Sequence, residues 1–155
     1  MSSHVPTKRY WFFAGSFLIT LLLYIDRVCI SSAKDSIASD LSLSDIEMGC
    51  VLSAFALGYA LFQVPGGSLG DKYGVRKVMT SIMVLLSIFT ALTGAAWNYI
   101  SMLFFRFTFW AGEAGAFPNI SREAFSWVPT KERGVFQGIN FSGSRLGAAF
   151  ALPLV

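Results

Sequence analysis

The sequence predicts an all-α membrane protein, and three observations support that fold class. The 155 residues are 54% hydrophobic and only 14% charged, whereas a soluble domain carries about a quarter charged residues. The apolar residues gather in five long runs. At about 20 residues per membrane-spanning helix, the chain has room for four or five spans. Composition thus argues against a soluble domain, and it excludes a disordered chain and, with a diffuse net charge of +3, a nucleic-acid-binding protein.

The predicted spans cover residues 11–30, 46–64, 78–97, 100–120 and 135–155. The first run follows Lys8 and Arg9, a pattern that also begins secretory signal peptides. Its apolar stretch is too long for a signal peptide, and four further runs follow it. The second run opens with Ser44 and Glu47 at the spacing of a capping box, which predicts the start of a helix.

The later runs are closely spaced. Only Asn98 and Tyr99 separate the third run from the fourth. The fifth run ends at Val155 without a flanking charge or polar anchor. We therefore expect the length of the chain to mark a truncation, with a sixth span and a C-terminal half missing.

Cysteine and histidine residues give no sign of a metal site. Cys29 and Cys50 lie in or beside apolar runs without the paired spacing of a zinc site, and the single histidine, His4, lies in the polar N-terminal segment. We interpret the cysteines as free, buried thiols, and we expect no metal and no organic cofactor.

The basic residues predict the orientation of the chain in the membrane. With the N-terminus in the cytoplasm, the outer segments contain a single cation, Lys34. Trp97 and Tyr99 then lie at the outer interface, where aromatic side chains are favoured. This bias predicts a cytoplasmic N-terminus. We expect a multi-pass protein of the cell's plasma or inner membrane. The eight cytoplasmic cations are Lys8, Arg9, Lys72, Arg76, Lys77, Arg122, Lys131 and Arg133.

Small residues recur four positions apart within the runs, a spacing that allows two helices to approach closely. Glycine and alanine are also simply common in membrane helices, so each pair is open to both interpretations. The four pairs are Ala54 with Gly58, Ala56 with Ala60, Gly134 with Gly138, and Gly143 with Gly147.

Five charged residues interrupt the apolar runs: Asp26, Arg27, Arg106, Glu113 and Arg145. Each costs about 2.5–3.5 kcal/mol at the centre of a membrane helix, so these side chains are expected to face one another or a wet cavity. Arg106 and Glu113 are two helical turns apart and share a helix face. One interpretation is a polar, mostly cationic transport cavity, and the other is a set of buried ion pairs. Three cations against two anions favour a site for an anionic substrate.

A glycine-rich basic segment, residues 67–77, connects the second and third runs. Its glycines permit a tight turn, and its Asp71 can pair with nearby cations while capping a helix. The segment matches G-x-L-x-D-[RK]-x-G-x-[RK]-[RK], the cytoplasmic signature of the major facilitator superfamily. The chain therefore resembles the N-terminal part of a transporter of that superfamily.

Three further segments resemble motifs of one branch, the anion:cation symporters, which carries sugar acids such as galactonate, glucarate and hexuronates. Residues 24–31 read YIDRVCIS and resemble the first-span motif Y-x-D-R-x-x-I-S. Residues 106–118 resemble the fourth-span motif R…G-E-x…P, and residues 127–133 resemble the loop that follows it. The match extends over nearly the whole chain.

The resemblance implies a fold of twelve helices in two halves, with substrate bound between the halves near the midplane of the membrane. It implies that Asp26 and Glu113 take up protons and that Arg27 and Arg106 hold those carboxylates and the substrate carboxylate. Tyr24 and Tyr59 resemble hydroxyl groups that line the cavity. The expected cytoplasmic gating motif consists of Gly67, Asp71, Gly74, Arg76, Lys77 and Arg122, with Arg122 as the expected partner of Asp71.

Two positions depart from the family pattern. Trp110 replaces a usually small residue, which predicts a narrower cavity or altered packing. Arg145, preceded by Ser144, is an added cation where other members carry neutral polar residues. We expect both Ser144 and Arg145 to contact substrate, and the added cation suggests a substrate with two carboxylates.

The predicted function is proton-coupled symport of a small sugar-acid anion across the cytoplasmic membrane. Sodium is the alternative coupling ion, and a truncated remnant or half-subunit that does not transport is the alternative function. A membrane-embedded enzyme is not expected, because the sequence has no metal-ligand cluster, no nucleophile and base pair, and no cofactor loop. The expected partners are the organic anion, the lipid bilayer and the missing C-terminal half.

Overall fold

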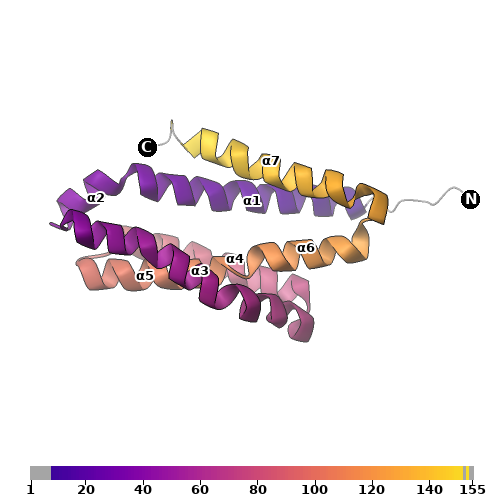
Figure 1. Ribbon diagram of the computed structural model, residues 1–155, viewed down its shortest axis with the longest axis horizontal. Helices are drawn as coiled ribbons and strands as arrows, with labels where there is room; N and C mark the ends of the chain where they lie inside the picture. The colour runs from indigo at the N-terminus through magenta and orange to yellow at the C-terminus, as the bar shows by residue number, and fades with distance from the viewer. Residues whose placement is uncertain (1–7, 152, 154–155) are drawn as a thin grey trace, which may run out of the picture. The chain divides into compact units, whose positions relative to one another are not determined.

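The computed structural model describes residues 8–151 and residue 153, and every element in that part of the chain is a helix (Figure 1). This confirms the all-α prediction. The chain forms two compact units, one of residues 1–32 and 121–155 and the other of residues 33–120. Within the predicted last span, residues 152, 154 and 155 lie outside the described residues.

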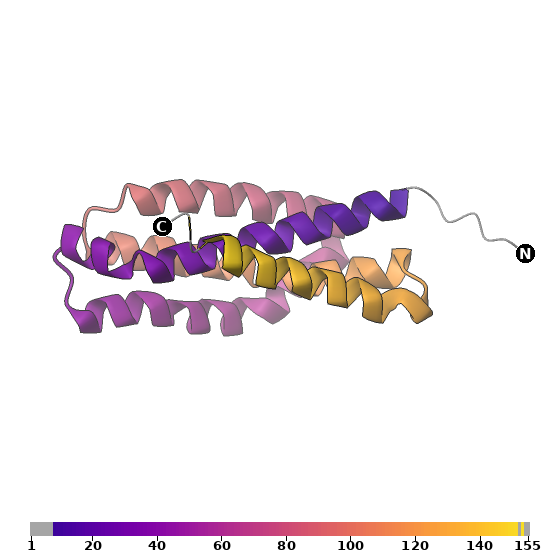
Figure 2. The ribbon, with the colours of Figure 1, turned by 90° about the horizontal axis from the view of Figure 1, so that it is seen from above.

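In the first unit, two helices, α1 (Lys8–Ser32) and α7 (Arg133–Ala151), run side by side (Figure 1, Figure 2). The two helices are closest at Gly143 and Gly147. A Cβ atom on Gly143 would lie 2.8 Å from the Thr20 hydroxyl, and one on Gly147 would collide with the Leu21 carbonyl. The predicted close packing of this glycine pair is thus confirmed.

The other glycine pair of the same helix does not pack in this way. Gly134 and Gly138 are exposed, and a Cβ atom on either would have nothing within 4 Å. At that end of the unit, aromatic contacts join the helices instead. Phe136 is buried between Phe12 and Phe13, with ring centroids 5.3 Å and 4.8 Å away.

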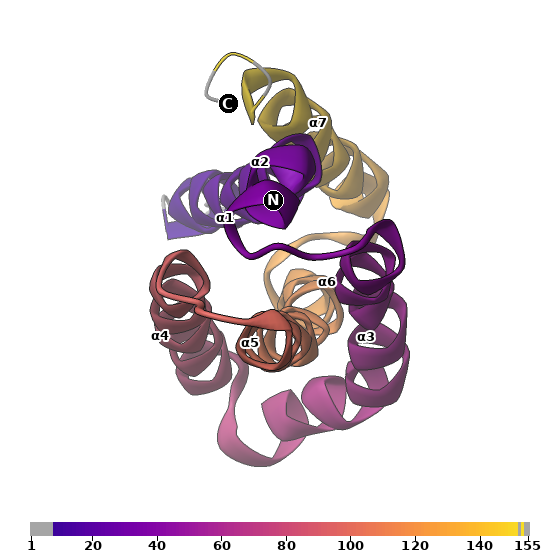
Figure 3. The same ribbon diagram turned by 90° about the vertical axis from the view of Figure 1, so that its left-hand side faces the viewer.

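The second unit consists of α2 (Lys34–Asp40), α3 (Asp45–Tyr73), α4 (Val75–Gly94), α5 (Tyr99–Glu113) and the first turn of α6 (Ala116–Trp127). Figure 3 shows α5 between α3 and α4. The capping box predicted for the second run is confirmed, because Ser44 and Glu47 exchange side-chain and backbone hydrogen bonds of 3.3 Å and 2.9 Å.

The helix α3 continues nine residues beyond the end of the second predicted span. That span was expected to stop at residue 64, before Pro65, but α3 continues to Tyr73 and changes direction in its second half (Figure 3). Proline removes one backbone donor, yet membrane helices tolerate it where neighbouring helices support the chain. Here the segment after Pro65 packs against the start of α6, where a Cβ atom on Gly67 would lie 3.1 Å from Pro118.

The run predicted as a span over residues 100–120 contains two helices, α5 and α6, rather than one. Gly115 bonds to the carbonyl of Gly112, one residue short of the α-helical spacing. Pro118 cannot donate to the carbonyl of Ala114, and proline is accepted in the first turn of a new helix. The glycines and the proline together break the run at Ala114 and Gly115.

Small residues bring α3 against this break. Gly58, Gly66 and Gly70 lie on one face of α3 at multiples of four residues, and Ala54, on the same face, is buried. A Cβ atom on Gly66 would lie 2.7 Å from the Cα atom of Gly115, so the two backbones are in direct contact. A Cβ atom on Gly58 would lie 3.2 Å from the carbonyl oxygen of Phe107 on α5, so the predicted close packing at Gly58 is confirmed. Ala56 and Ala60 are exposed.

Asn119 fixes the contact between α3 and the break. Its side chain is fully buried, and the amide nitrogen donates to the carbonyl of Gly66 at 2.9 Å and to that of Gly115 at 2.7 Å. The amide oxygen occupies the space next to Gly70 where a side chain would otherwise lie. One asparagine of α6 thus joins α3 to the helix break.

Three of the described helices are long and apolar enough to cross a bilayer: α1 from Tyr10 onward, α3 and α4. At about 1.5 Å per residue, the 29 residues of α3 extend over about 44 Å, beyond a hydrocarbon core of about 30 Å. The last turn of α3, with Asp71 and Lys72, therefore extends past the apolar region.

We predict that Gly70→Ala destabilises the protein, because the added methyl group displaces the Asn119 amide from its two carbonyl partners. Loss of hydrogen bonds by a buried amide costs about 1–3 kcal/mol. The matched control is Gly49→Ala in the same helix, where a Cβ atom has nothing within 4 Å. Thermal unfolding of the purified protein in detergent would show a lower midpoint for the first variant only. Equal midpoints would contradict the role given to Asn119.

Candidate functional site

Two of the predicted site residues, Arg106 and Glu113, lie on one buried face of α5. Their side chains are 5% and 0% exposed, among the lowest values for charged residues in the described chain. Between them the same face carries Phe109 and Trp110, which are also buried. A buried arginine and a buried carboxylate in an apolar helix are costly, so they are retained for specific interactions.

Aromatic rings surround the Arg106 guanidinium. Its central carbon lies 5.2 Å from the ring centroid of Phe109 and 5.9 Å from that of Trp110, within the range of cation–π attraction. Trp110 in turn contacts Phe55 of α3 at 5.0 Å, and Phe55 contacts Tyr59 at 5.4 Å. This aromatic cluster, defined as Phe55, Tyr59, Phe109 and Trp110, connects the predicted site residues Tyr59 and Arg106.

Trp110 is buried between α3 and α5. The sequence left a narrowed cavity and altered packing as alternatives, and the structure shows a packing residue that is 3% exposed. Its Cβ atom lies against Gly58, where a side chain on that glycine would approach to 3.2 Å. Trp110 therefore fills the α3–α5 interface and presents its ring to Arg106.

On α1, the predicted residues Tyr24, Asp26 and Arg27 are all half-buried. The guanidinium carbon of Arg27 lies 4.9 Å from the centroid of the Tyr24 ring. Both units thus contain an arginine from the charged set that is held against an aromatic ring of its own helix.

The two predicted residues of α7 have opposite environments. Ser144 is buried and donates its hydroxyl hydrogen to the carbonyl of Asn140 at 3.3 Å. Arg145 lies on the exposed side of the helix, away from the face that packs on α1. Among the described residues, Arg145 is therefore not part of a buried charged group.

Sequence reasoning missed Asn140. Its side chain is 2% exposed, and both polar atoms of its amide lack a hydrogen-bond partner within the described chain. The carbonyl of Asn140 accepts from the Thr20 hydroxyl at 3.2 Å, which holds the residue at the α1–α7 interface. An asparagine within an apolar run is the signal that could have identified it, since buried amides are normally satisfied by a partner, a water or a ligand.

The structure distributes the predicted site residues between the two units. The first contains Tyr24, Asp26, Arg27, Ser144 and Arg145, and the second contains Tyr59, Arg106 and Glu113. Within the second unit, Tyr59 and Arg106 belong to one continuous set of contacts. Whether all eight residues line one cavity stays a prediction.

The predicted gating motif is more helical than expected. Among its glycines, only Gly74 makes the turn, with a φ of 86° that favours glycine, and it separates α3 from α4. Gly67 lies within α3 and packs against Pro118. Three charged members, Asp71, Arg76 and Lys77, are exposed around the turn. Arg122 is exposed on α6 in the other unit, so its pairing with Asp71 stays a prediction.

Arg133 organises the loop that resembles the third family motif. Its guanidinium donates to the carbonyl of Phe125 at 3.1 Å and to that of Val128 at 3.2 Å. It also lies 4.3 Å from the centroid of the Phe125 ring. These bonds satisfy carbonyls that the end of α6 leaves without helical donors, and they fix the path into the short helix η1 (Thr130–Glu132) and α7.

Comparison with known proteins decides the family. The sequence profile of the Major Facilitator Superfamily matches residues 16–155. The chain belongs to the major facilitator superfamily. The proteins of this superfamily are membrane transporters and not enzymes, so the prediction that the chain is not an enzyme is confirmed, and the chain is a membrane protein.

Curated relatives within the superfamily carry the names of organic-anion transporters. A probable sulfoacetate transporter of Cupriavidus necator is 41% identical over 89% of this chain and 32% of its own length. A probable galactarate/D-glucarate transporter of Escherichia coli is 40% identical over 95% of this chain and 34% of its own length. The hexuronate transporter of Bacillus subtilis is 34% identical over 90% of this chain and 33% of its own length. The chain spans about a third of the length of these relatives.

A solved structure has the same major facilitator fold. A bacterial homologue of the human lysosomal transporter Spinster, in an inward-facing and unoccupied conformation, matches with a TM-score of 0.88 and 30% identity. The match covers 94% of this chain and 31% of that protein.

We predict that Arg133→Ala loosens the loop between α6 and α7, because the carbonyls of Phe125 and Val128 lose a charged donor. The free energy of local opening is expected to fall by about 1–3 kcal/mol. Hydrogen–deuterium exchange of residues 125–134 would report this as faster exchange. Lys131→Ala, which removes an exposed cation from the same loop, is the control and is expected to leave exchange unchanged. Equal exchange in the two variants would contradict the prediction.

Proposed function

We propose that this chain is the N-terminal part of a secondary transporter that carries small organic anions across the membrane together with protons. The proposed substrates are sugar acids such as hexuronate, glucarate or galactonate, and the proposed site is the cytoplasmic membrane, with the N-terminus inside the cell. The observation that carries the proposal is the buried pair of charged residues, Arg106 and Glu113, on one face of α5. The names of the curated relatives support the substrate class.

The substrate carboxylate binds to arginine in this proposal. Arg106 is suited to that role because the aromatic cluster holds its guanidinium in place, and a pre-positioned planar fork loses little freedom on binding a carboxylate. Arg27, held against Tyr24, is the proposed second cation. The hydroxyl groups of Tyr24, Tyr59 and Ser144 are the proposed partners of the sugar hydroxyls.

Arg145 is the proposed contact for a second substrate carboxylate. It is exposed in the described chain, so this role requires the binding cavity to extend to the outer side of α7. A substrate with one carboxylate would not need it.

Coupling to protons follows from competition for the arginines. An ionised Glu113 pairs with an arginine and occupies the cationic site. Protonation removes that charge and releases the arginine for the substrate, so a proton and an anion load together. Asp26 is the proposed second proton site.

Glu113→Gln tests this coupling. The amide mimics the protonated carboxyl, so we expect the variant to bind and exchange substrate but not to accumulate it against a gradient. Uptake of radiolabelled hexuronate, glucarate and galactonate into proteoliposomes, with and without an imposed pH gradient, measures both properties. The control is Glu123→Gln, the same change in a carboxylate that is not a proposed proton site. The Glu123 carboxylate accepts a 2.7 Å hydrogen bond from Trp127. Accumulation by the Glu113 variant would disprove the scheme.

Arg106→Ala tests substrate binding. Removal of a buried charged partner costs about 2–5 kcal/mol, which corresponds to at least about 30-fold weaker binding. Calorimetric titration with the transported sugar acid measures the affinity, and Lys34→Ala, in an exposed residue, is the control. Arg106→Lys would retain part of the affinity. An unchanged affinity with a lowered unfolding midpoint would instead identify Arg106 as a partner in a structural ion pair.

Two alternatives are distinguished by related experiments. Uptake driven by a sodium gradient in the absence of a pH gradient would identify sodium as the coupling ion. The coding sequence downstream of Val155 distinguishes a carrier from a short remnant or half-subunit, and uptake in cells that express that complete coding sequence tests transport directly.

A further inference from the structure

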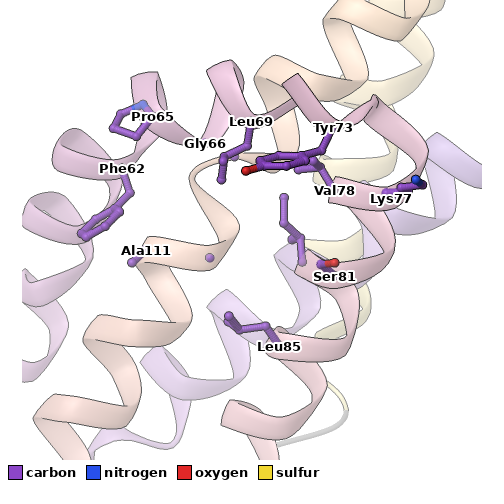
Figure 4. Close-up of a pocket in the computed structure, with 13 residues that line it drawn as sticks. Phe62, Pro65, Gly66, Leu69, Tyr73, Lys77, Val78, Ser81, Leu85 and Ala111 are labelled. Carbon is purple, nitrogen blue, oxygen red and sulfur yellow. The ribbon is translucent and has the colours of Figure 1, made fainter. Parts of the chain in front are cut away.

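The second unit contains an apolar groove that the proposed transport mechanism does not use. It has a volume of about 470 Å³ and lies between the second half of α3, the first half of α4 and the end of α5. Phe62 and Leu69 of α3 form one side, and Val78 and Leu85 of α4 form the other (Figure 4). Ile82 of α4 also lines the groove.

The helix break creates the space for this groove. Its floor consists of Ala111, Gly112 and Gly115, which have small side chains or none. On the α3 side, Pro65 and Gly66 add no long side chain. The volume lies within the range of about 300–1,000 Å³ that small-molecule sites occupy.

One end of the groove is polar and basic. Figure 4 shows Tyr73 and Lys77 at the same end, with Leu85 toward the other end. The ammonium of Lys72 lies 5.3 Å from the centroid of the Tyr73 ring, and Lys72, Arg76 and Lys77 are all exposed. Among the lining residues, Lys77 carries the only charge. An apolar groove with cations at one end complements a molecule with an apolar chain and an anionic head.

We propose that this groove binds an anionic phospholipid of the cytoplasmic leaflet. One acyl chain lies along the apolar side chains of α3 and α4, and the phosphate contacts Lys77 at the end of the groove. Basic pockets between membrane helices on the cytoplasmic side bind anionic head groups, and tyrosine favours the level of those head groups. The proposal uses the orientation predicted from the basic residues, and it holds for whichever anion is carried.

Charge decides between an anionic and a neutral lipid. An acyl chain in the groove would be equally favourable for both classes, whereas each lysine or arginine near an anionic head group contributes about 1 kcal/mol. A preference for anionic lipid that depends on Lys77 is therefore the specific consequence of this site.

The experiment compares phosphatidylglycerol with phosphatidylcholine of identical acyl chains. Native mass spectrometry of the purified protein measures the dissociation constant of each lipid. We expect tighter binding of phosphatidylglycerol, and about fivefold weaker binding of that lipid to Lys77→Gln. Lys131→Gln, which removes an exposed cation outside the groove, is the matched control and should keep the preference.

A second variant tests the acyl-chain part of the site. Ser81 is an exposed lining residue of α4, so Ser81→Phe fills the groove without removing a charge or a buried contact. We expect weaker binding of both lipids to this variant, with thermal unfolding used to confirm that it folds.

Several outcomes would overturn the proposal. Equal affinity for the two lipids, or an equal loss of phosphatidylglycerol affinity in Lys77→Gln and Lys131→Gln, would show that there is no specific anionic site. Displacement of the lipid by inorganic phosphate at millimolar concentration would identify a site for free phosphate. Crosslinks from Ser81→Cys to a second copy, or to another helix of the same protein, would show that protein covers the groove.

Discussion

The close approach of α3 to the helix break is the contact on which the second unit depends. Gly66 and Gly115 meet backbone to backbone, and no side chain fits between them. Because α3 lies this close, Asn119 of α6 can reach the carbonyls of both Gly66 and Gly115 and so hold α3 against the break. The same small residues leave the floor of the lipid groove open. Packing of small residues is the main force that joins helices in a bilayer, where apolar side chains gain little from contact with one another.

Two arginines in the apolar helices contact aromatic rings of the protein. Arg106 lies against two aromatic rings, and Arg27 lies against one. A ring face compensates part of the cost of burying a guanidinium while leaving its hydrogen-bond donors for another partner. This arrangement suits the exchange of a protein carboxylate for a substrate carboxylate that we propose for Arg106. In contrast, Lys72, Arg76 and Lys77 are exposed around the Gly74 turn, where water or head groups solvate them.

The sequence predicted those features that depend on local chemistry. The capping box of Ser44 and Glu47 was predictable because the spacing of the two residues determines it. The spacing of four residues between Gly143 and Gly147 indicated a close helix contact, but the same spacing at Gly134 and Gly138 does not produce one, because that contact depends on which face meets the neighbouring helix. The break after Glu113 was missed although Gly112, Gly115 and Pro118 were visible, since hydropathy joins residues 100–120 into one apolar run. The extension of α3 past Pro65 was also missed, because it depends on contacts with Pro118 and Asn119 that are distant in sequence. For the site, the burial of Arg106 and Glu113 followed from their place in an apolar run. The aromatic cluster did not, since it requires the pairing of α3 with α5.

The helix break connects the proposed coupling residue with the proposed lipid groove. Glu113 is buried at the end of α5, while its neighbours Gly112 and Gly115 form the groove floor. A rearrangement of this turn during transport would therefore change the shape of the groove as well as the surroundings of Glu113. A bound lipid influences transport only through a difference in its affinity for two conformations. The shared turn provides a physical basis for such a difference, because the floor of the groove and the proposed proton-binding residue belong to one short segment of backbone.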